Sequence, residues 1–241
     1  MTHLGVVVLH GLGGSPHAVM PITAAVHGAG YSTVSPHLPG HGTTPDDLIG
    51  RTWTEWLDAV LEVSDELAAR TGRIVVIGQS LGATLALAVA TRRESIIGVA
   101  AINALVVAPG PDATEHLQHL IGRGRTMQPA GDPDLRDPDA HDSAYPELAL
   151  SALIELGVGA ASVNESMHRI VVPTFIASSA FDGVVDPANS DVIAAAVRGP
   201  VKRLVMANSA HVAALDLDRD RLCTELLTWL AGLTDGSVPA D

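Results

Sequence analysis

Short runs rich in valine and isoleucine recur along the chain, and most are separated by segments whose apolar residues repeat at helical intervals. A strand of a parallel sheet shows such an unbroken apolar run, because helices cover both of its faces. The alternation therefore predicts an α/β fold with a mostly parallel sheet flanked by helices. The predicted strands are residues 6–9, 32–34, 74–77, 97–102, 174–177 and 203–206.

Two segments between these runs carry signals for the start of a helix. Thr52 and Glu55 have the spacing of a capping box, and the apolar residues after them repeat at helical intervals up to Gly72. Ser15 before Pro16 is typical of a cap followed by the first helical residue. Both segments are therefore predicted to be helices between strands.

The length and composition are those of one globular domain. The chain has 241 residues, of which 47% are hydrophobic and 17% charged, enough to bury a core. Its net charge of −13 would repel phosphate backbones, so we expect no nucleic-acid partner. The N-terminus lacks the positive start of a signal peptide, and no stretch approaches the roughly 20 apolar residues of a membrane span. We expect a soluble cytoplasmic protein with no integral membrane segment, and the sequence leaves its oligomeric state open.

The alternation is interrupted between residues 105 and 170. This stretch holds an acidic run at 131–139 and a helix-like segment at 149–156. A loop this long in a compact domain is usually functional or carries its own elements. We predict one domain, with residues 1–104 and 171–241 as its core and 105–170 as a cap insertion covering one edge of the sheet. The acidic run lacks the glycine and glutamate positions of a calcium loop, which favours a solvated face.

Ser80 is the central residue of a G-x-S-x-G segment at residues 78–82. The segment directly follows a predicted strand and directly precedes a helix-like segment, which is the context of a nucleophile elbow. A sharp turn of this kind exposes the serine on a strained backbone, and the glycines allow the chain to pass closely. Ser80 is therefore the candidate nucleophile.

A serine hydroxyl is a weak nucleophile at neutral pH and needs a base that a carboxylate orients. His211 follows the last predicted strand, so its ring is expected at the carboxyl end of the sheet, where ligands bind. Asp182 and Asp186 both follow the preceding strand. Asp182 is favoured as the acid, because N-capping of the next helix explains Asp186. The order serine, acid, histidine is that of the α/β hydrolases.

Acyl transfer also needs donors for the developing oxyanion. The backbone N–H of Leu81, next to the serine, is one candidate. The other is Leu12, in a glycine-rich loop after the first strand. A dinucleotide-binding loop is the alternative interpretation of Gly11 and Gly13, but Pro16 stands where the third glycine is required.

The other histidines have simpler explanations than a metal site. His10 is predicted to be structural, and His37 and His41 flank a turn. His116 and His119 lie at helical spacing without a third ligand in a zinc pattern, which favours a polar surface of the insertion. We expect no metal and no cofactor.

Five segments of the chain carry recognisable motifs, which are residues 8–15, 39–42, 78–82, 181–187 and 208–216. Together they resemble bacterial monoacylglycerol lipases and the small thermostable-type carboxylesterases over nearly the whole chain. The resemblance implies an α/β-hydrolase core with a small cap inserted after the strand that follows the serine helix. It also implies that Ser80, Asp182 and His211 form a triad and that Leu12 and Leu81 supply the oxyanion amides. Leu12 departs from the family, where an aromatic residue is common at this position.

The sequence thus predicts a serine esterase or lipase that hydrolyses carboxylic esters, with a monoacylglycerol or a related simple acyl ester as its small-molecule substrate. Thioester or lactone hydrolysis on the same triad remains an alternative, since the fold does not select the substrate. A ligand-binding protein that keeps the fold without turnover is a further alternative.

Overall fold

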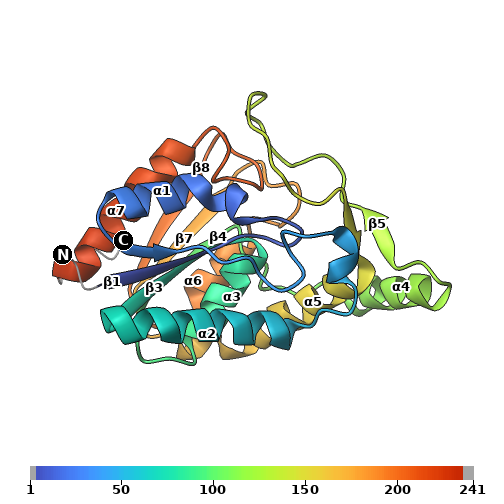
Figure 1. Ribbon diagram of the computed structural model, residues 1–241, viewed down its shortest axis with the longest axis horizontal. Helices are drawn as coiled ribbons and strands as arrows, with labels where there is room; N and C mark the ends of the chain where they lie inside the picture. Colours follow the sequence, from blue (N-terminus) through green and yellow to red (C-terminus); the bar gives the residue numbers. More distant parts are fainter. Residues whose placement is uncertain (1–3, 236–241) are drawn as a thin grey trace.

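A six-stranded sheet forms the centre of the computed structural model, which describes residues 4–235 (Figure 1). Every strand pair in this sheet is parallel, as the alternation predicts. The spatial order is β2-β1-β3-β4-β7-β8. The strands are β1 (Leu4–Leu9), β2 (Ser32–Val34), β3 (Arg73–Gln79), β4 (Ile96–Ile102), β7 (Thr174–Ser179) and β8 (Val201–Met206).

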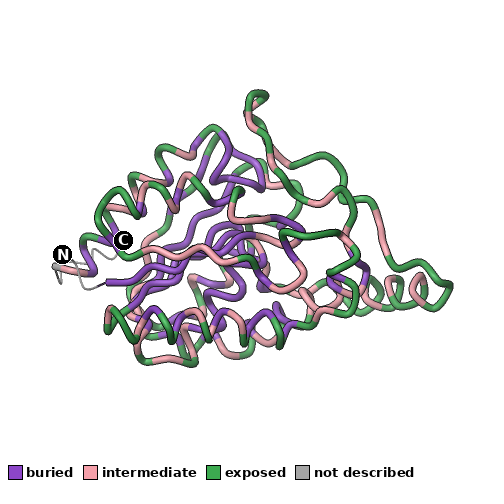
Figure 2. The backbone as a smooth tube through the Cα atoms, in the orientation of Figure 1, coloured by how far each residue is buried: buried purple, intermediate pink, exposed green. Residues whose placement is uncertain are grey.

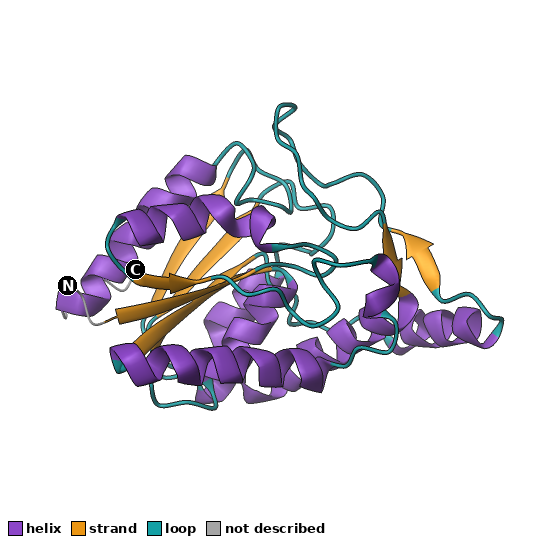
Figure 3. Cartoon of the chain, in the orientation of Figure 1, coloured by secondary structure: helices purple, strands orange, loops and turns teal. Residues whose placement is uncertain are grey.

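Helices cover both faces of the sheet (Figure 3). In Figure 1, α1 and α7 lie on one face, and α2, α3 and α6 lie on the other. The α-helices of the core are α1 (Met20–Gly28), α2 (Trp53–Thr71), α3 (Leu81–Ala90), α6 (Asn189–Ala196) and α7 (Arg219–Asp235), and the short 3₁₀ helices are η1 (Pro16–Val19) and η2 (Pro45–Leu48). Ser15 caps η1, which leads into α1, so the predicted helix begins with a 3₁₀ turn.

The side chains of β3 show why a continuous apolar run is required here. Ile74 and Val76 belong to the core beneath α2 and α3, whereas Val75 and Ile77 belong to the core beneath α1 and α7. Successive side chains of a strand point to opposite faces, so a strand covered on both faces must be apolar at every position. The buried backbone accordingly follows the central strands in Figure 2.

The chain between β4 and β7 forms the insertion. Its elements are α4 (Pro111–Gly122), the antiparallel pair β5 (Met127–Pro129) and β6 (Glu147–Ala149), α5 (Leu150–Ser166) and η3 (Met167–Arg169). α5 packs against α2 and α3 of the core. The segment before it lies beyond the carboxyl ends of the strands (Figure 1), where its residues share a pocket with Ser80. The expectation that the insertion covers one edge of the sheet is therefore wrong: it covers the carboxyl end.

The predicted capping box at the start of α2 is confirmed. The Thr52 hydroxyl accepts the Glu55 N–H at 3.2 Å, and the Glu55 carboxylate accepts the Thr52 N–H at 2.8 Å. These bonds satisfy two of the donors that a helix leaves unpaired at its N-terminus. Gly72 ends the helix with a φ of 76°.

Thr52→Ala should lower the free energy of unfolding by about 1 kcal/mol, because the cap hydroxyl is lost. Urea unfolding measures the change. Thr52→Ser keeps the hydroxyl and should stay close to the wild type. Equal losses in the two variants would contradict a role for the cap.

Candidate active site

The serine turn is forced by a close crossing of backbone segments. Ser80 joins β3 to α3 with φ 57° and ψ −123°, an unfavourable backbone conformation for a residue with a side chain. A Cβ atom on Gly78 would overlap the carbonyl group of Gly82, and one on Gly82 would overlap the carbonyl oxygen of Leu9 in β1. The G-x-S-x-G pattern therefore follows from the absence of space for side chains.

Ser80, His211 and Asp182 lie in one hydrogen-bonded row. The His211 Nε2 is 2.9 Å from the Ser80 Oγ, and its Nδ1 is 2.9 Å and 3.0 Å from the two carboxylate oxygens of Asp182. The side chains of His211 and Asp182 are only 11% and 2% exposed. With Nδ1–H donated to the carboxylate, Nε2 is left as the acceptor that faces the serine hydroxyl.

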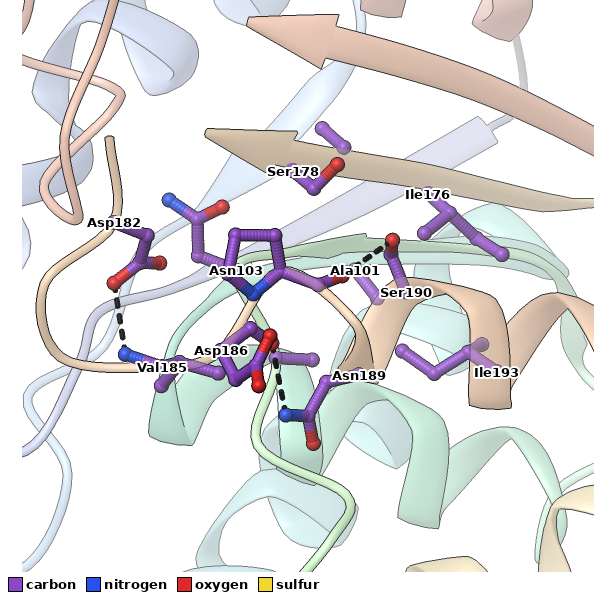
Figure 4. A pocket seen from close by; sticks show the side chains of 13 residues that line it. Ala101, Asn103, Ile176, Ser178, Asp182, Val185, Asp186, Asn189, Ser190 and Ile193 are labelled. Carbon is purple, nitrogen blue, oxygen red and sulfur yellow. Dashed lines mark hydrogen bonds between the residues drawn. The ribbon is translucent and has the colours of Figure 1, made fainter. Parts of the chain in front are cut away.

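Asp182 and Asp186 have different surroundings, although both follow β7. The Asp182 carboxylate accepts the N–H groups of Val184 and Val185 in addition to the imidazole. Figure 4 shows its bond to Val185. Asp186 is exposed and accepts the N–H of Ala188 just before α6. Asp186 thus stabilises a turn, and only Asp182 contacts His211.

Buried polar side chains hold the loop that carries His211. Asn103, at the end of β4, donates its side-chain N–H to the His211 carbonyl at 2.8 Å and to the Ser179 hydroxyl at 2.9 Å. Gln79, next to the serine, accepts the N–H of Ala214 at 3.0 Å. No sequence pattern indicates a role for Asn103, and only its place inside the serine motif points to Gln79.

Leu12 and Leu81 lie where their backbone N–H groups are free to donate. Within residues 4–235, neither group makes a hydrogen bond. Leu81 is the first residue of α3, where a helix leaves its N–H groups unpaired. Leu12 lines the same pocket as Ser80, and a Cβ on the neighbouring Gly11 would lie 3.2 Å from the Ser80 Cβ.

Two neutral histidines support the loop after β1. The His41 Nε2 accepts the N–H of Gly13 at 3.0 Å while its Nδ1 donates to the Pro39 carbonyl at 3.1 Å. In the same way, the His10 Nε2 accepts the N–H of Leu38. Burial, the largest cause, lowers the pKa of His10 to about 3 and that of His41 to about 4. His10 is structural as predicted, and the interpretation of His41 as a turn residue missed its bond to the loop.

A pocket of about 400 Å³ opens beside Ser80. Its apolar wall is formed by the insertion, the loop after β1 and the loops that carry Asp182 and His211, and its polar wall includes Asp132, Asp134 and Asp142 of the insertion. The apolar lining residues are Leu12, Leu148, Leu153, Leu156, Val184 and Val212.

Asp142 stands out in the polar wall. Its Oδ1 is buried and has no hydrogen-bond partner among the described residues. Burial raises the pKa of this carboxyl above its ordinary range. The Asp142 carboxyl thus adds a polar group to the lining of the pocket that contains Ser80.

The acidic run differs from its sequence interpretation. Asp134 accepts the N–H groups of Gly183 and His211, and Asp137 forms an ion pair with Arg219 at 2.6 Å. The prediction of a solvated face is therefore wrong for these two residues. Their partners are distant in the sequence, so no local pattern could have indicated them.

His116 and His119 do not contribute to this site, because both are exposed on α4. Across residues 4–235, no group of three or more His, Cys, Asp or Glu side chains is arranged to hold a metal ion. In the same residues, no helix has the length and apolar character needed to cross a membrane.

A parallel sheet with an elbow serine at its carboxyl end is the arrangement of the α/β hydrolases. The model of the alpha/beta hydrolase family matches residues 6–231, and the chain belongs to that family. It is 34% identical over 232 residues to the thermostable monoacylglycerol lipase of Bacillus sp. (strain H-257), covering 95% of this chain and 90% of that protein.

Further similar proteins agree with this membership. The carboxylesterase of Bacillus subtilis (strain 168) is 22% identical, with 95% of this chain and 92% of that protein covered. A solved structure from work on the metagenome-derived lipolytic enzymes LipS and LipT is 28% identical with a TM-score of 0.89, covering 95% of this chain and 94% of that one. The resemblance that the sequence motifs carry is thereby confirmed.

The buried histidines should make stability depend on pH. The folded pKa of His41, about 4, lies below its ordinary value of 6.5, so the unfolded chain takes up the proton first. The contribution of neutral His41 to the free energy of unfolding is therefore complete above pH 6.5 and is lost as the pH falls toward 4. The difference between the two pKa values corresponds to a loss on the order of 3 kcal/mol in the free energy of unfolding.

His41→Gln removes the titrating group and can still accept the Gly13 N–H. We expect this variant to lose less free energy of unfolding between pH 7 and pH 4 than the wild type, as measured by urea unfolding at each pH. Identical slopes in the two proteins would contradict the argument. His119→Gln, an exposed histidine, is the matched control and should follow the wild type.

Proposed function

We propose that the protein is a serine esterase that hydrolyses carboxylic esters through an acyl-enzyme. Ser80 is the nucleophile, His211 the general base and acid, and Asp182 the carboxylate that orients the imidazole. The observation that supports this most directly is the hydrogen-bonded row of these three side chains, with 2.9 Å between Ser80 Oγ and His211 Nε2. The similarity to a monoacylglycerol lipase and to a carboxylesterase supports the same reaction.

In the acylation half of the reaction, His211 Nε2 takes the proton of Ser80 as the Oγ attacks the ester carbonyl. The carbonyl oxygen becomes an oxyanion, which the N–H groups of Leu12 and Leu81 stabilise. Asp182 stabilises the imidazolium that forms. When the tetrahedral intermediate collapses, the imidazolium gives its proton to the departing alcohol, and the acyl group stays on Ser80.

Deacylation repeats these steps with water. His211 takes a proton from the water, whose oxygen attacks the acyl carbonyl, and the same two amides stabilise the second oxyanion. Return of the proton to Ser80 Oγ releases the carboxylic acid and restores the enzyme.

The pocket favours a substrate with one apolar and one hydroxyl-bearing part. Leu148, Leu153 and Leu156 offer an apolar wall to an acyl chain, and Asp132 and Asp142 bring carboxyl groups for an alcohol hydroxyl to the same pocket. A monoacylglycerol has both parts, and the volume of about 400 Å³ lies within the range of small-molecule sites. We therefore propose monoacylglycerols or related simple acyl esters as substrates.

The experiment that tests this function has two parts. The first measures hydrolysis of acyl esters of graded chain length, of monoacylglycerols and of a matched thioester. Turnover of the oxygen esters supports the proposal, and no turnover at any chain length would overturn it. The second part labels the protein with a fluorophosphonate probe, which should react in the wild type and not in Ser80→Ala. A wild type that stays unlabelled would indicate a binding protein without turnover.

The two aspartates after β7 provide a matched pair for the role of the acid. Asp182→Asn should lower kcat on the order of 10⁴-fold, since an asparagine cannot hold the productive tautomer of the histidine. Asp186→Asn removes the same charge from an exposed turn and should keep kcat close to the wild type. Steady-state kinetics on one ester compare the two, and equal losses would contradict the assignment of Asp182.

A further inference from the structure

The carboxylate of Asp134, in the insertion, bonds both to the loop that carries Asp182 and to the loop that carries His211. The Oδ2 of Asp134 accepts the backbone N–H of His211 at 3.0 Å and the backbone N–H of Gly183 at 2.8 Å. Gly183 directly follows Asp182. A single oxygen atom thus bridges the loop of the acid, residues 180–188, and the loop of the base, residues 207–218.

The segment around Asp134 is itself fixed to the base loop. The Val212 N–H donates to the backbone carbonyl of Asp134 at 3.2 Å. Asp216, which is fully buried, accepts the N–H of Arg136 at 3.1 Å and that of Asp137 at 2.8 Å. These bonds leave the Asp134 side chain little freedom to move away from the two loops.

A second contact ties the same segment to the acid loop. The guanidinium of Arg136 lies 3.8 Å from the centre of the Phe181 ring, in cation–π geometry. Segment 134–137 therefore holds both loops, through a shared carboxylate oxygen and through this stacking contact.

The two sides of the base loop are held by different parts of the molecule. Asn103 of the core fixes the carbonyl of His211 at 2.8 Å, and Asp134 of the insertion fixes its N–H. With both peptide groups beside the imidazole held, the ring can meet Ser80 and Asp182 at once. Proton transfer requires this, because a misplacement of about 1 Å can reduce a rate on the order of 100-fold.

We propose that Asp134 is a positioning residue for the triad: its carboxylate, supplied by the insertion, sets the relative position of the His211 and Asp182 loops. The proposal rests on the proposed function of the three side chains. It gives the insertion a part in assembling the catalytic geometry, in addition to its part in lining the pocket.

The kinetic test uses a short acetyl ester, which limits contact between the acyl chain and the insertion. Asp134→Ala should lower kcat on the order of 10- to 100-fold with little change in KM, because both bonds are lost. Asp134→Asn should recover most of this loss, since its amide oxygen can accept the same two N–H groups. Asp139→Ala is the matched control: it removes an exposed carboxylate from the same acidic run, and its kcat should stay close to the wild type.

A spectroscopic readout does not depend on turnover. The proton between His211 Nδ1 and Asp182 gives a low-field ¹H NMR resonance when the ring and carboxylate are aligned. It should be present in the wild type and in Asp134→Asn, and broadened or lost in Asp134→Ala. Urea unfolding identifies variants that fail to fold. If Asp134→Ala fails to fold, Asp134→Glu is measured instead. This variant keeps the charge but displaces the carboxylate oxygens, so it should lose kcat and the NMR resonance as expected for Asp134→Ala.

The outcomes separate this proposal from the proposed function. Failure of the function appears as a wild type without turnover and without fluorophosphonate label, and the NMR resonance still decides the role of Asp134 in that case. A folded Asp134→Ala with the kcat and the resonance of the wild type would overturn the positioning role. So would an Asp134→Asn variant as impaired as Asp134→Ala, because the bonds would then not be the cause.

Discussion

The site depends on the close crossing of the serine turn over β1. Gly78 and Gly82 have no room for a side chain, and Ser80 between them is held at φ 57°. The strain in this turn persists because β3 and α3 are both packed into the core and cannot move apart. As a result, the hydroxyl and the first N–H of α3 are presented at the same point, at the carboxyl end of the sheet.

Around this rigid turn, the other parts of the site are held by side chains that bond to the backbone. Neutral His41 accepts the N–H of Gly13 in the loop of Leu12, and Asn103 and Asp134 fix the two peptide groups of His211. Loops without regular structure need such partners, because their buried polar groups have no ladder or helix to satisfy them. These bonds hold the irregular loops around Ser80, His211 and Asp182 in place, as the proposed acid–base chemistry requires.

The insertion has two roles in this arrangement. Its residues form most of the lining of the pocket next to Ser80, both apolar and polar. Through segment 134–137 it also contacts both loops of the triad. The lining of the proposed substrate pocket and the contacts to both loops therefore come from one structural element.

The pattern of amino acids is enough to predict the class of fold and the three side chains of the candidate site. The apolar runs had to be strands of a parallel sheet because both of their faces are buried, and the glycines around Ser80 marked a turn without space. The places of His211 and Asp182 after two later strands then predicted where those side chains lie. These features could be predicted because each is local or follows from the rule that parallel strands end on the same side.

Which of the other polar residues support the site depends on contacts between distant parts of the chain. His41, Asn103 and Asp134 bond to backbone groups between 28 and 108 positions away along the chain, and no periodicity or motif encodes such a pairing. The same holds for the insertion, whose place over the carboxyl end of the sheet follows from how α5 packs on α2 and α3. Contacts of this kind arise from three-dimensional packing, so a local sequence pattern cannot specify them.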